Sequence, residues 1–160
     1  MLRHRIGPLL WTHSYTLSKM TIQHEAINDG QAYRADWDRR HQATTDVQGT
    51  LGPHLNWHVT WLLASGTPNS LAFADTTETE PATLPTYHRM DIGLQYRRAF
   101  GSMTLEATTS VFNVYDRNNT WYRSPVAVFD PAQMPRRVRF SNVDVYDLGF
   151  QPSFSLSLTF

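Results

Sequence analysis

Apolar and polar side chains alternate along six segments of this 160-residue chain. In the clearest internal segment, every second residue from Leu55 to Leu63 is leucine, tryptophan or valine. A period of two residues is the signature of a β-strand with one apolar and one polar side. The pattern predicts strands at about Leu9–Lys19, Arg40–Leu51, Leu55–Ala64, Tyr87–Arg97, Ser102–Val114 and Ser153–Phe160. No segment shows a comparable helical period, so we expect an all-β protein, an antiparallel up-and-down meander of about six long strands.

The connections between these segments are either short or long. Tight turns join the second segment to the third, at residues 52–54, and the fourth to the fifth, at residues 98–101. The other three connections span about residues 20–39, 65–86 and 115–152. Long loops are uncommon in compact soluble domains, whereas outer-membrane barrels combine short periplasmic turns with long extracellular loops. The strand directions then place all three long connections outside the cell and both short turns in the periplasm.

Strand length favours a membrane barrel over a soluble sandwich, although alternation alone fits both. Most predicted strands have nine to twelve residues, against roughly 9–11 for a tilted membrane-spanning strand and about 5–6 for an average soluble one. His13 fits a lipid-facing side poorly, and we expect either a position near the membrane interface or a different strand register at this point. Aromatic residues near strand ends suit interfacial girdles, and they are Trp11, Trp57, Tyr87, Tyr96 and Phe160.

Composition narrows the possible functions. The formal net charge is zero, which argues against a nucleic-acid partner held by a positive field. The absence of cysteine excludes disulfides, thiolate catalysis and zinc–cysteine or iron–sulfur sites. The apolar runs, such as residues 61–64, are far shorter than the roughly 20 residues of a membrane-spanning helix. The first residues lack the apolar core of a signal peptide, so we expect either a cytosolic protein or the tail of a longer one.

The last thirteen residues, 148–160, resemble the final strand of TonB-dependent outer-membrane receptors, including the terminal phenylalanine. Five shorter segments resemble earlier parts of the same barrel in the same order, and they are residues 14–19, 38–42, 65–68, 84–91 and 110–117. The resemblance covers nearly the whole chain. It implies that residues 1–160 are the last six strands of a 22-stranded transmembrane barrel of the bacterial outer membrane, with the plug and signal peptide absent.

The same resemblance implies a role in active transport of a scarce solute, such as a ferric siderophore, cobalamin or an oligosaccharide. The implied partners are outer-membrane lipid, the remainder of the barrel and plug, the TonB system through the plug, and the barrel-assembly machinery. The assembly signal would be Phe154, Leu156, Leu158 and Phe160. Six strands alone would leave two open edges, which hydrocarbon does not tolerate, so we expect a receptor fragment.

The last long connection is the candidate ligand site. It combines basic and aromatic residues, a composition that suits an anionic ligand, although a solvated loop with ordinary packing explains it as well. The middle connection is acidic, with Asp75, Glu78 and Glu80, and we expect it to be solvated. The predicted ligand-binding residues are Arg117, Trp121, Tyr122, Arg123, Arg136 and Arg137.

We find no motif for catalysis or phosphate binding, and we expect no enzymatic activity, cofactor or metal. His54 and His58 lie four residues apart on one strand, roughly 13 Å, which is too far to bind one ion together. Arg89 and Asp91 share the polar side of a strand, and we expect an ion pair or hydrogen bonds facing the lumen.

Asp46 and Glu106 are expected to face the lumen as well, because a charge facing lipid is costly. The alternative interpretation is a small soluble β-barrel that binds a hydrophobic ligand, with its apolar side turned inward.

Overall fold

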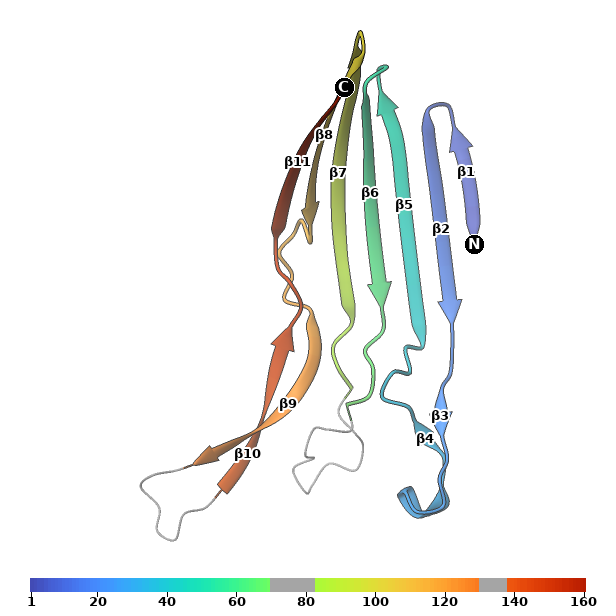
Figure 1. The fold of residues 1–160 in the computed structure, drawn as a ribbon. Coiled ribbons are helices and arrows are strands. Elements are labelled where there is room, and N and C mark those ends of the chain that lie inside the picture. Colours follow the sequence, from blue (N-terminus) through green and yellow to red (C-terminus); the bar gives the residue numbers. More distant parts are fainter. Residues whose placement is uncertain (70–82, 130–137) are drawn as a thin grey trace.

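The computed structural model describes residues 1–69, 83–129 and 138–160. Within these residues the chain forms one seven-stranded antiparallel sheet, in which every strand pairs with the next one along the chain that belongs to the sheet (Figure 1). Its strands, in spatial order, are β1 (Leu2–Ile6), β2 (Leu9–Leu17), β5 (His41–Leu51), β6 (Leu55–Ala64), β7 (Tyr87–Phe100), β8 (Met103–Phe112) and β11 (Gln151–Thr159). The predicted all-β, antiparallel architecture is confirmed.

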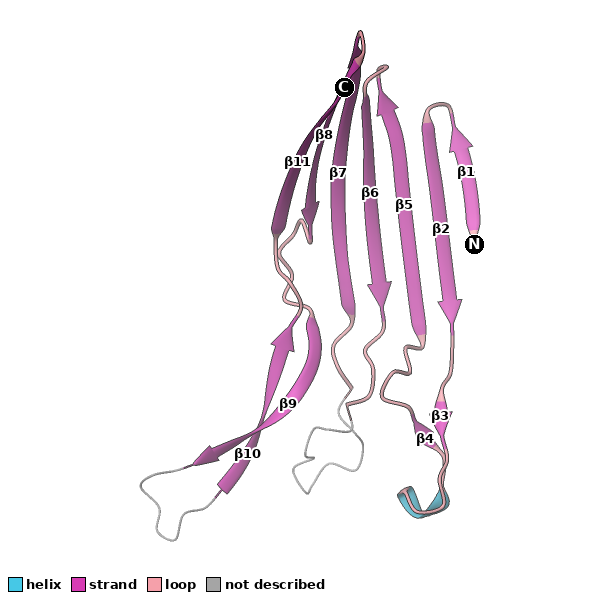
Figure 2. Cartoon of the chain, viewed as in Figure 1, coloured by secondary structure: helices cyan, strands magenta, loops and turns pink. Residues whose placement is uncertain are grey.

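Two smaller hairpins lie outside this sheet, as Figure 2 shows. Strands β3 (Thr21–Ile22) and β4 (Tyr33–Arg34) form a short ladder, with a single 3-10 turn at Asn28–Gly30 between them. Strands β9 (Thr120–Phe129) and β10 (Val138–Tyr146) form a longer hairpin. Two of the long connections therefore contain β-structure of their own, which the sequence pattern did not indicate.

The sheet has one strand more than predicted. Strand β1 forms a hairpin with β2 through a turn at Gly7 and Pro8, where Gly7 has a φ of 57°. Only three residues of β1 face the apolar side, and Arg3 and Arg5 alternate with them. A five-residue segment with two arginines also fits the basic start of a leader sequence, so the pattern alone does not predict this strand. The other six strands begin and end within three residues of their predicted limits.

The two ends of the sheet differ. Three short turns lie at one end, which we call the turn end, and Gly7, Gly52 and Gly101 adopt positive φ values there. All three long connections lie at the opposite end, the loop end (Figure 1). This arrangement confirms that the long connections lie together at one end of the sheet.

The strand registers sort the side chains into two faces. The apolar face carries rows of large hydrophobic residues across neighbouring strands, such as Trp11, Val47, Val59, Ile92 and Val111. The polar face carries hydroxyl, amide and charged groups, such as Thr12, Asp46, Thr60, Asp91, Glu106 and Ser157. Every strand of the sheet is therefore amphipathic in the same sense.

No packed hydrophobic core covers the apolar face within the described residues. Among these residues, the buried apolar side chains are Ala35, Ala64 and Leu84 alone. By contrast, Trp11 is 48% exposed and Phe154 is 70% exposed. A soluble domain of this length buries most of its large apolar residues, so this sheet is not built around an interior of its own.

Candidate functional site

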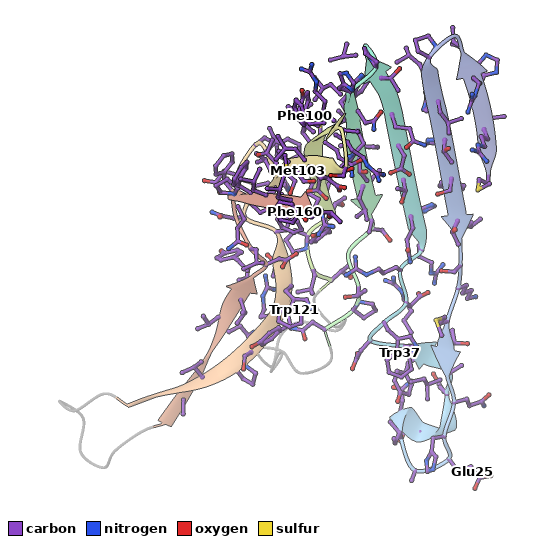
Figure 3. The ribbon with its side chains drawn as sticks, turned by 45° about the horizontal axis from the view of Figure 1, so that its top comes forward. Glu25, Trp37, Phe100, Met103, Trp121 and Phe160 are labelled. Carbon is purple, nitrogen blue, oxygen red and sulfur yellow. The ribbon has the colours of Figure 1, made fainter. Side chains whose placement is uncertain are left out.

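The loop end contains the most deeply buried polar groups of the described chain. Asn113 and Asp38 are completely buried, and Asn119 and Thr120 are nearly so. Figure 3 shows this end, with Trp37 on the connection between β2 and β5 and Trp121 on the β9–β10 hairpin. Because buried polar groups must be hydrogen-bonded to be tolerated, their partners explain how the loop end is held together.

Asn113 ties the end of β8 to both flanks of the β9–β10 hairpin. Its Nδ2 donates to the carbonyl oxygens of Arg117, at 2.9 Å, and Leu148, at 3.1 Å, while its Oδ1 accepts the Arg117 N–H. The Asn113 backbone N–H donates to Asp91 at 2.9 Å. Asn113 has a φ of 52°, a conformation that asparagine tolerates better than most residues. The hairpin is thereby fixed to the sheet at its base.

The Asn119 side chain makes the two backbone hydrogen bonds that a neighbouring strand would make with β7. Its side-chain oxygen accepts the N–H of His88 at 3.0 Å, and its Nδ2 donates to the His88 carbonyl at 2.9 Å. This reciprocal pair satisfies the free edge of β7 beyond its ladder with β8. Tyr87 lies beside it on the polar face, where its hydroxyl donates to Asp147 at 2.7 Å. Of the aromatic residues predicted to form interfacial girdles, Tyr87 therefore lies on the polar face. Trp11, Trp57 and Tyr96 lie on the apolar face.

Two of the predicted ligand-binding arginines form hydrogen bonds or ion pairs with other residues of the chain. The Arg117 guanidinium donates to Asn119 at 3.2 Å and to the carbonyl of Thr86 at 3.3 Å. Arg123 forms a two-pronged ion pair with Asp144 across the β9–β10 ladder, and this hydrogen bonding lowers the pKa of Asp144. The structure therefore uses both cations to hold the hairpin. Arg136 and Arg137 lie outside the described residues, as do Asp75, Glu78 and Glu80 of the middle connection.

Trp121 and Tyr122, by contrast, are free on the surface of the hairpin. The β9–β10 register pairs Thr120 with Tyr146 and Tyr122 with Val145, so Trp121 is an extra residue in a β-bulge. The two aromatic rings meet edge to face, with centroids 5.3 Å apart. Trp121 is 64% exposed and Tyr122 is 44% exposed. Bulges commonly re-aim side chains next to binding sites, and this one presents an aromatic pair to solvent.

A second anchor holds the connection between β2 and β5. The Asp38 carboxylate accepts hydrogen bonds from Arg40 Nε at 2.8 Å, from Arg34 Nε at 2.9 Å and from the Met20 N–H at 2.8 Å. The hydrogen bonds from Arg40 and Arg34 hold the pKa of Asp38 well below its ordinary value of 3.8. Asp38 and Arg40 belong to residues 38–42, which resemble part of the receptor barrel in sequence. The sequence pattern did not indicate these hydrogen bonds.

The polar face carries paired charges, as expected for Arg89 and Asp91. Their side chains form an ion pair of 3.1 Å. Asp46 accepts a hydrogen bond from Thr60 at 2.8 Å, and Glu106 accepts one from Gln95 at 2.8 Å. These groups stabilise one another in rows across the strands and leave the face hydrophilic.

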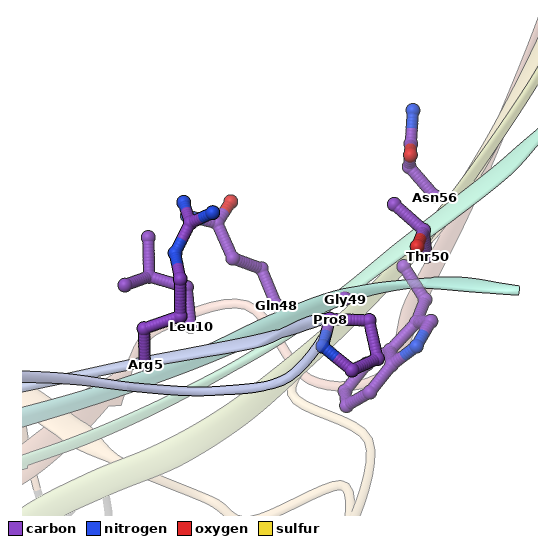
Figure 4. A pocket seen from close by; sticks show the side chains of 8 residues that line it. Arg5, Pro8, Leu10, Gln48, Gly49, Thr50 and Asn56 are labelled. Atoms are coloured by element: carbon purple, nitrogen blue, oxygen red, sulfur yellow. The ribbon is translucent and has the colours of Figure 1, made fainter.

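The polar face is also hollowed at the turn end. This hollow of about 340 Å³ lies between the β1–β2 and β5–β6 hairpins (Figure 4). It lies at the end of the sheet opposite to the predicted ligand-binding connection. Its lining residues are Arg5, Pro8, Leu10, Gln48, Gly49, Thr50, Asn56 and Trp57.

The predicted assembly residues lie on the edge strand β11 and directly after it. Phe154, Leu156 and Leu158 all face the apolar side, with 70%, 64% and 49% of their surface exposed. Phe160 follows the strand and is 85% exposed. Among the described residues, strand β11 pairs only with β8, and no described strand pairs with its other backbone edge.

Neither a metal site nor a membrane-spanning helix is found in the described parts of the chain. They contain no group of three or more histidine, aspartate or glutamate side chains placed to hold an ion. His54 lies against Tyr96, whereas His58 lies against Gly93. None of their helical segments is long and apolar enough to cross a membrane.

Comparison with known proteins gives no relative: no protein-family model, no curated protein and no solved structure matches this chain significantly. The sheet, its two faces and its loop end are therefore the features from which a function can be inferred.

Proposed function

We propose that this chain forms part of the wall of an outer-membrane β-barrel, with its apolar face against lipid and its polar face lining an aqueous lumen. The observation that carries the proposal is the continuous, uncovered apolar face of the seven-stranded sheet. Soluble monomers rarely expose apolar patches larger than a few hundred Å², whereas lipid favours such a surface. Six of the seven strands have nine to fourteen residues, enough to cross a bilayer when tilted.

The two edges of the sheet support a larger barrel. In the part of the chain that the structure describes, strands β1 and β11 each pair with one neighbour only. In hydrocarbon an unpaired backbone edge is too costly to persist, because no water is present to bind its N–H and C=O groups. We infer that further strands pair with both edges when the protein is in its membrane.

The paired charges of the polar face also fit this orientation. Arg89 and Asp91 would face a wet lumen, where partial hydration and mutual pairing both stabilise them. On the lipid side such charges would be strongly destabilising. The loop end would then be extracellular and the turn end periplasmic, as in known outer-membrane barrels.

The more specific part of the proposal is transport by a receptor of the TonB-dependent kind. It is supported by six family-like segments in the family's order and by long connections gathered at one end of the sheet. In this function the chain would help to close the barrel and present its connections to a scarce solute. The TonB system would drive uptake through the plug of the complete receptor. The exposed, edge-strand position of Phe154, Leu156 and Leu158 suits an assembly signal.

Among the predicted ligand-binding residues of the described loop end, the exposed and unpaired side chains are aromatic, whereas the basic ones are paired within the chain. Arg117 and Arg123 are bound within the chain, while the Trp121–Tyr122 pair is exposed on an anchored hairpin. Such a pair suits stacking on a flat or ring-shaped part of a solute. We therefore propose that Trp121 and Tyr122 contact the solute and that Arg117 and Arg123 position them.

The alternative, a soluble barrel with an apolar interior, would need the sheet to close on itself around the apolar face. The described sheet is open, with β1 and β11 as its edges, so this function is less well supported.

Fluorescence quenching by lipids with brominated acyl chains would test the proposal. Trp57 and Trp61 lie on the apolar face, whereas Trp37 and Trp121 lie at the loop end. A variant that keeps only the first pair should be quenched in vesicles, and a variant that keeps only the second should not. A monodisperse, β-rich chain in plain buffer, with no quenching of either pair, would support the soluble alternative instead.

A further inference from the structure

The apolar face of the sheet carries one permanently charged side chain. Among the described strand residues of this face, Arg98 of β7 is the only lysine, arginine, aspartate or glutamate. Arg98 lies opposite Leu105 of β8, and Leu105 lies opposite Leu158 of β11, so its neighbours in this row are aliphatic. A charge in such surroundings needs its own explanation, because a charge that faces hydrocarbon is costly.

Arg98 has no polar partner among the described residues. None of them forms an ion pair or a side-chain hydrogen bond with its guanidinium. Strand β7 lies inside the sheet, between β6 and β8, so a further strand of a larger barrel would not lie next to it. Glu106 is opposite Arg97 in the register and therefore belongs to the polar face. The partner of Arg98 is thus expected in the medium that faces the apolar side.

The guanidinium of Arg98 is directed toward the turn end. Its Cζ lies 4.8 Å from the centroid of the Phe100 ring, and Phe100 is the last residue of β7. Arg98 itself is exposed. Long basic side chains of membrane proteins keep their stems on apolar surface and bend their charged ends toward the polar headgroups. The contact with Phe100 shows this direction for Arg98.

The length of β7 places Arg98 at the margin of the hydrocarbon. The strand has 14 residues, whereas a tilted strand crosses the hydrocarbon with about 9–11. Only Ala99 and Phe100 follow Arg98 in the strand, so any such stretch of β7 ends before Arg98 or includes it among its last three residues. Arginine on the lipid side is costly at the bilayer centre and nearly without cost close to the interface. Position and direction together bring the guanidinium to the headgroup level.

We propose that Arg98 binds the phosphate group of a lipid headgroup at the turn-end boundary of the membrane, an inference that rests on the proposed membrane orientation. The planar guanidinium presents paired N–H donors that match two phosphate oxygens. Phe100, Met103 and Phe160 are exposed at the same end of the sheet (Figure 3) and offer apolar contacts to the acyl chains. The site holds the turn end at a fixed depth in the bilayer.

Solid-state NMR gives a direct test. The full chain, labelled with ¹³C-arginine, is placed in vesicles of phosphatidylethanolamine and phosphatidylglycerol, and dephasing of the guanidinium Cζ signals by ³¹P is measured. Arg98→Gln should lose the contribution of one guanidinium to this dephasing. Arg97→Gln is the matched control, because Arg97 is the preceding residue and faces the polar side, and it should keep the wild-type dephasing. Equal dephasing in the wild type and Arg98→Gln, or an equal loss in both variants, would overturn the proposal.

A second sample separates lipid phosphate from free phosphate. In vesicles of phosphate-free galactolipid suspended in phosphate buffer, the Arg98-dependent dephasing should disappear. Its persistence there would assign the site to inorganic phosphate and overturn the role of the headgroup.

The outcomes also separate this proposal from the one on which it rests. Both variants should keep the quenching of Trp57 and Trp61 by brominated lipids, which shows that they still insert. If this quenching is present but Arg98→Gln changes no dephasing, the headgroup proposal is wrong and the membrane orientation stands. If neither quenching nor Arg98-dependent dephasing is observed, both proposals fail.

Discussion

The sheet and the loop end of this molecule distribute polarity in opposite ways. In the sheet, large apolar side chains are the exposed ones, with Phe154 at 70% and Leu156 at 64%. At the loop end, the most deeply buried side chains are polar, with Asp38 and Asn113 at 0%. Soluble proteins show neither feature as a rule. The difference teaches that the described sheet buries few apolar side chains of its own, whereas the loop end is held by hydrogen bonds within the chain.

The two regions should therefore respond to different kinds of change. A substitution in the sheet should matter through the polarity of the face it alters. A substitution at the loop end should matter through the backbone and side-chain geometry it disturbs.

The largest effect is expected from a charge on the apolar face. Val47 lies near the middle of β5, between Trp11 and Val59 on neighbouring strands. In the proposed membrane orientation, Val47→Arg should lower the free energy of unfolding in lipid by about 2–4 kcal/mol, the cost of arginine on the lipid side of a barrel near the bilayer centre. Denaturant unfolding of the chain in lipid vesicles would measure this value.

Gln48→Arg provides the matched control, because Gln48 follows Val47 and faces the polar side. Its effect should stay within about 0.5 kcal/mol, as for an ordinary exposed substitution. Equal effects of the two substitutions would contradict the assignment of the faces to lipid and lumen.

The long strands were predictable because their information is local. The alternation in residues 55–64 is complete within ten residues, and β6 begins and ends where the pattern does. Strand β9 was not predicted, since Trp121 and Tyr122 interrupt its alternation at the bulge and Pro125 is disfavoured in strands. Pattern reasoning thus finds strands that keep one period and misses those that change it.

The loop-end anchors could not be predicted for a different reason. Asn113 bonds to Leu148 and Asn119 bonds to His88, residues 35 and 31 positions away. Asparagine in a loop is ordinary, and only the fold shows that these amides complete the sheet. The sequence named Trp121, Tyr122 and Arg123 together as candidate ligand-binding residues, and it could not show that Arg123 pairs with Asp144 across an unpredicted hairpin.

A pair of glycines gives the second test of the contrast. A Cβ at Gly66, at the loop end, would overlap the backbone carbonyl of Leu84, which cannot move without breaking the local structure. A Cβ at Gly93, in the sheet, would overlap only the imidazole of His58, an exposed side chain that can turn away. Gly66→Ala should therefore cost about 1–3 kcal/mol of unfolding free energy, the usual range for overpacking.

Gly93→Ala should change the unfolding free energy by less than about 1 kcal/mol, because alanine is also the better residue inside a strand. Unfolding of both variants under the same conditions would compare them. A larger loss for Gly93→Ala than for Gly66→Ala would show that the sheet, and not the loop end, is the geometrically constrained region.

The smallest effect concerns the response of the loop end to acid. The hydrogen bonds from Arg40 and Arg34 lower the pKa of Asp38 below its ordinary value of 3.8. A carboxyl group with a lowered pKa in the folded state contributes stability that is complete above the unfolded pKa and is lost as the pH falls through the folded pKa. Hydrogen exchange of the Met20 amide, which donates to Asp38, should therefore show constant protection from pH 7 to about 4, and protection should fall only in stronger acid.

The Ser18 amide donates to a backbone carbonyl, that of Arg40, and serves as the internal reference, because any change it shares with Met20 reports general opening of the connection. In Asp38→Asn the acid-dependent loss at Met20 should disappear, since no carboxylate remains to be protonated. A loss of Met20 protection between pH 7 and 5 in the wild type, with Ser18 unchanged, would show that the two arginines do not stabilise the carboxylate.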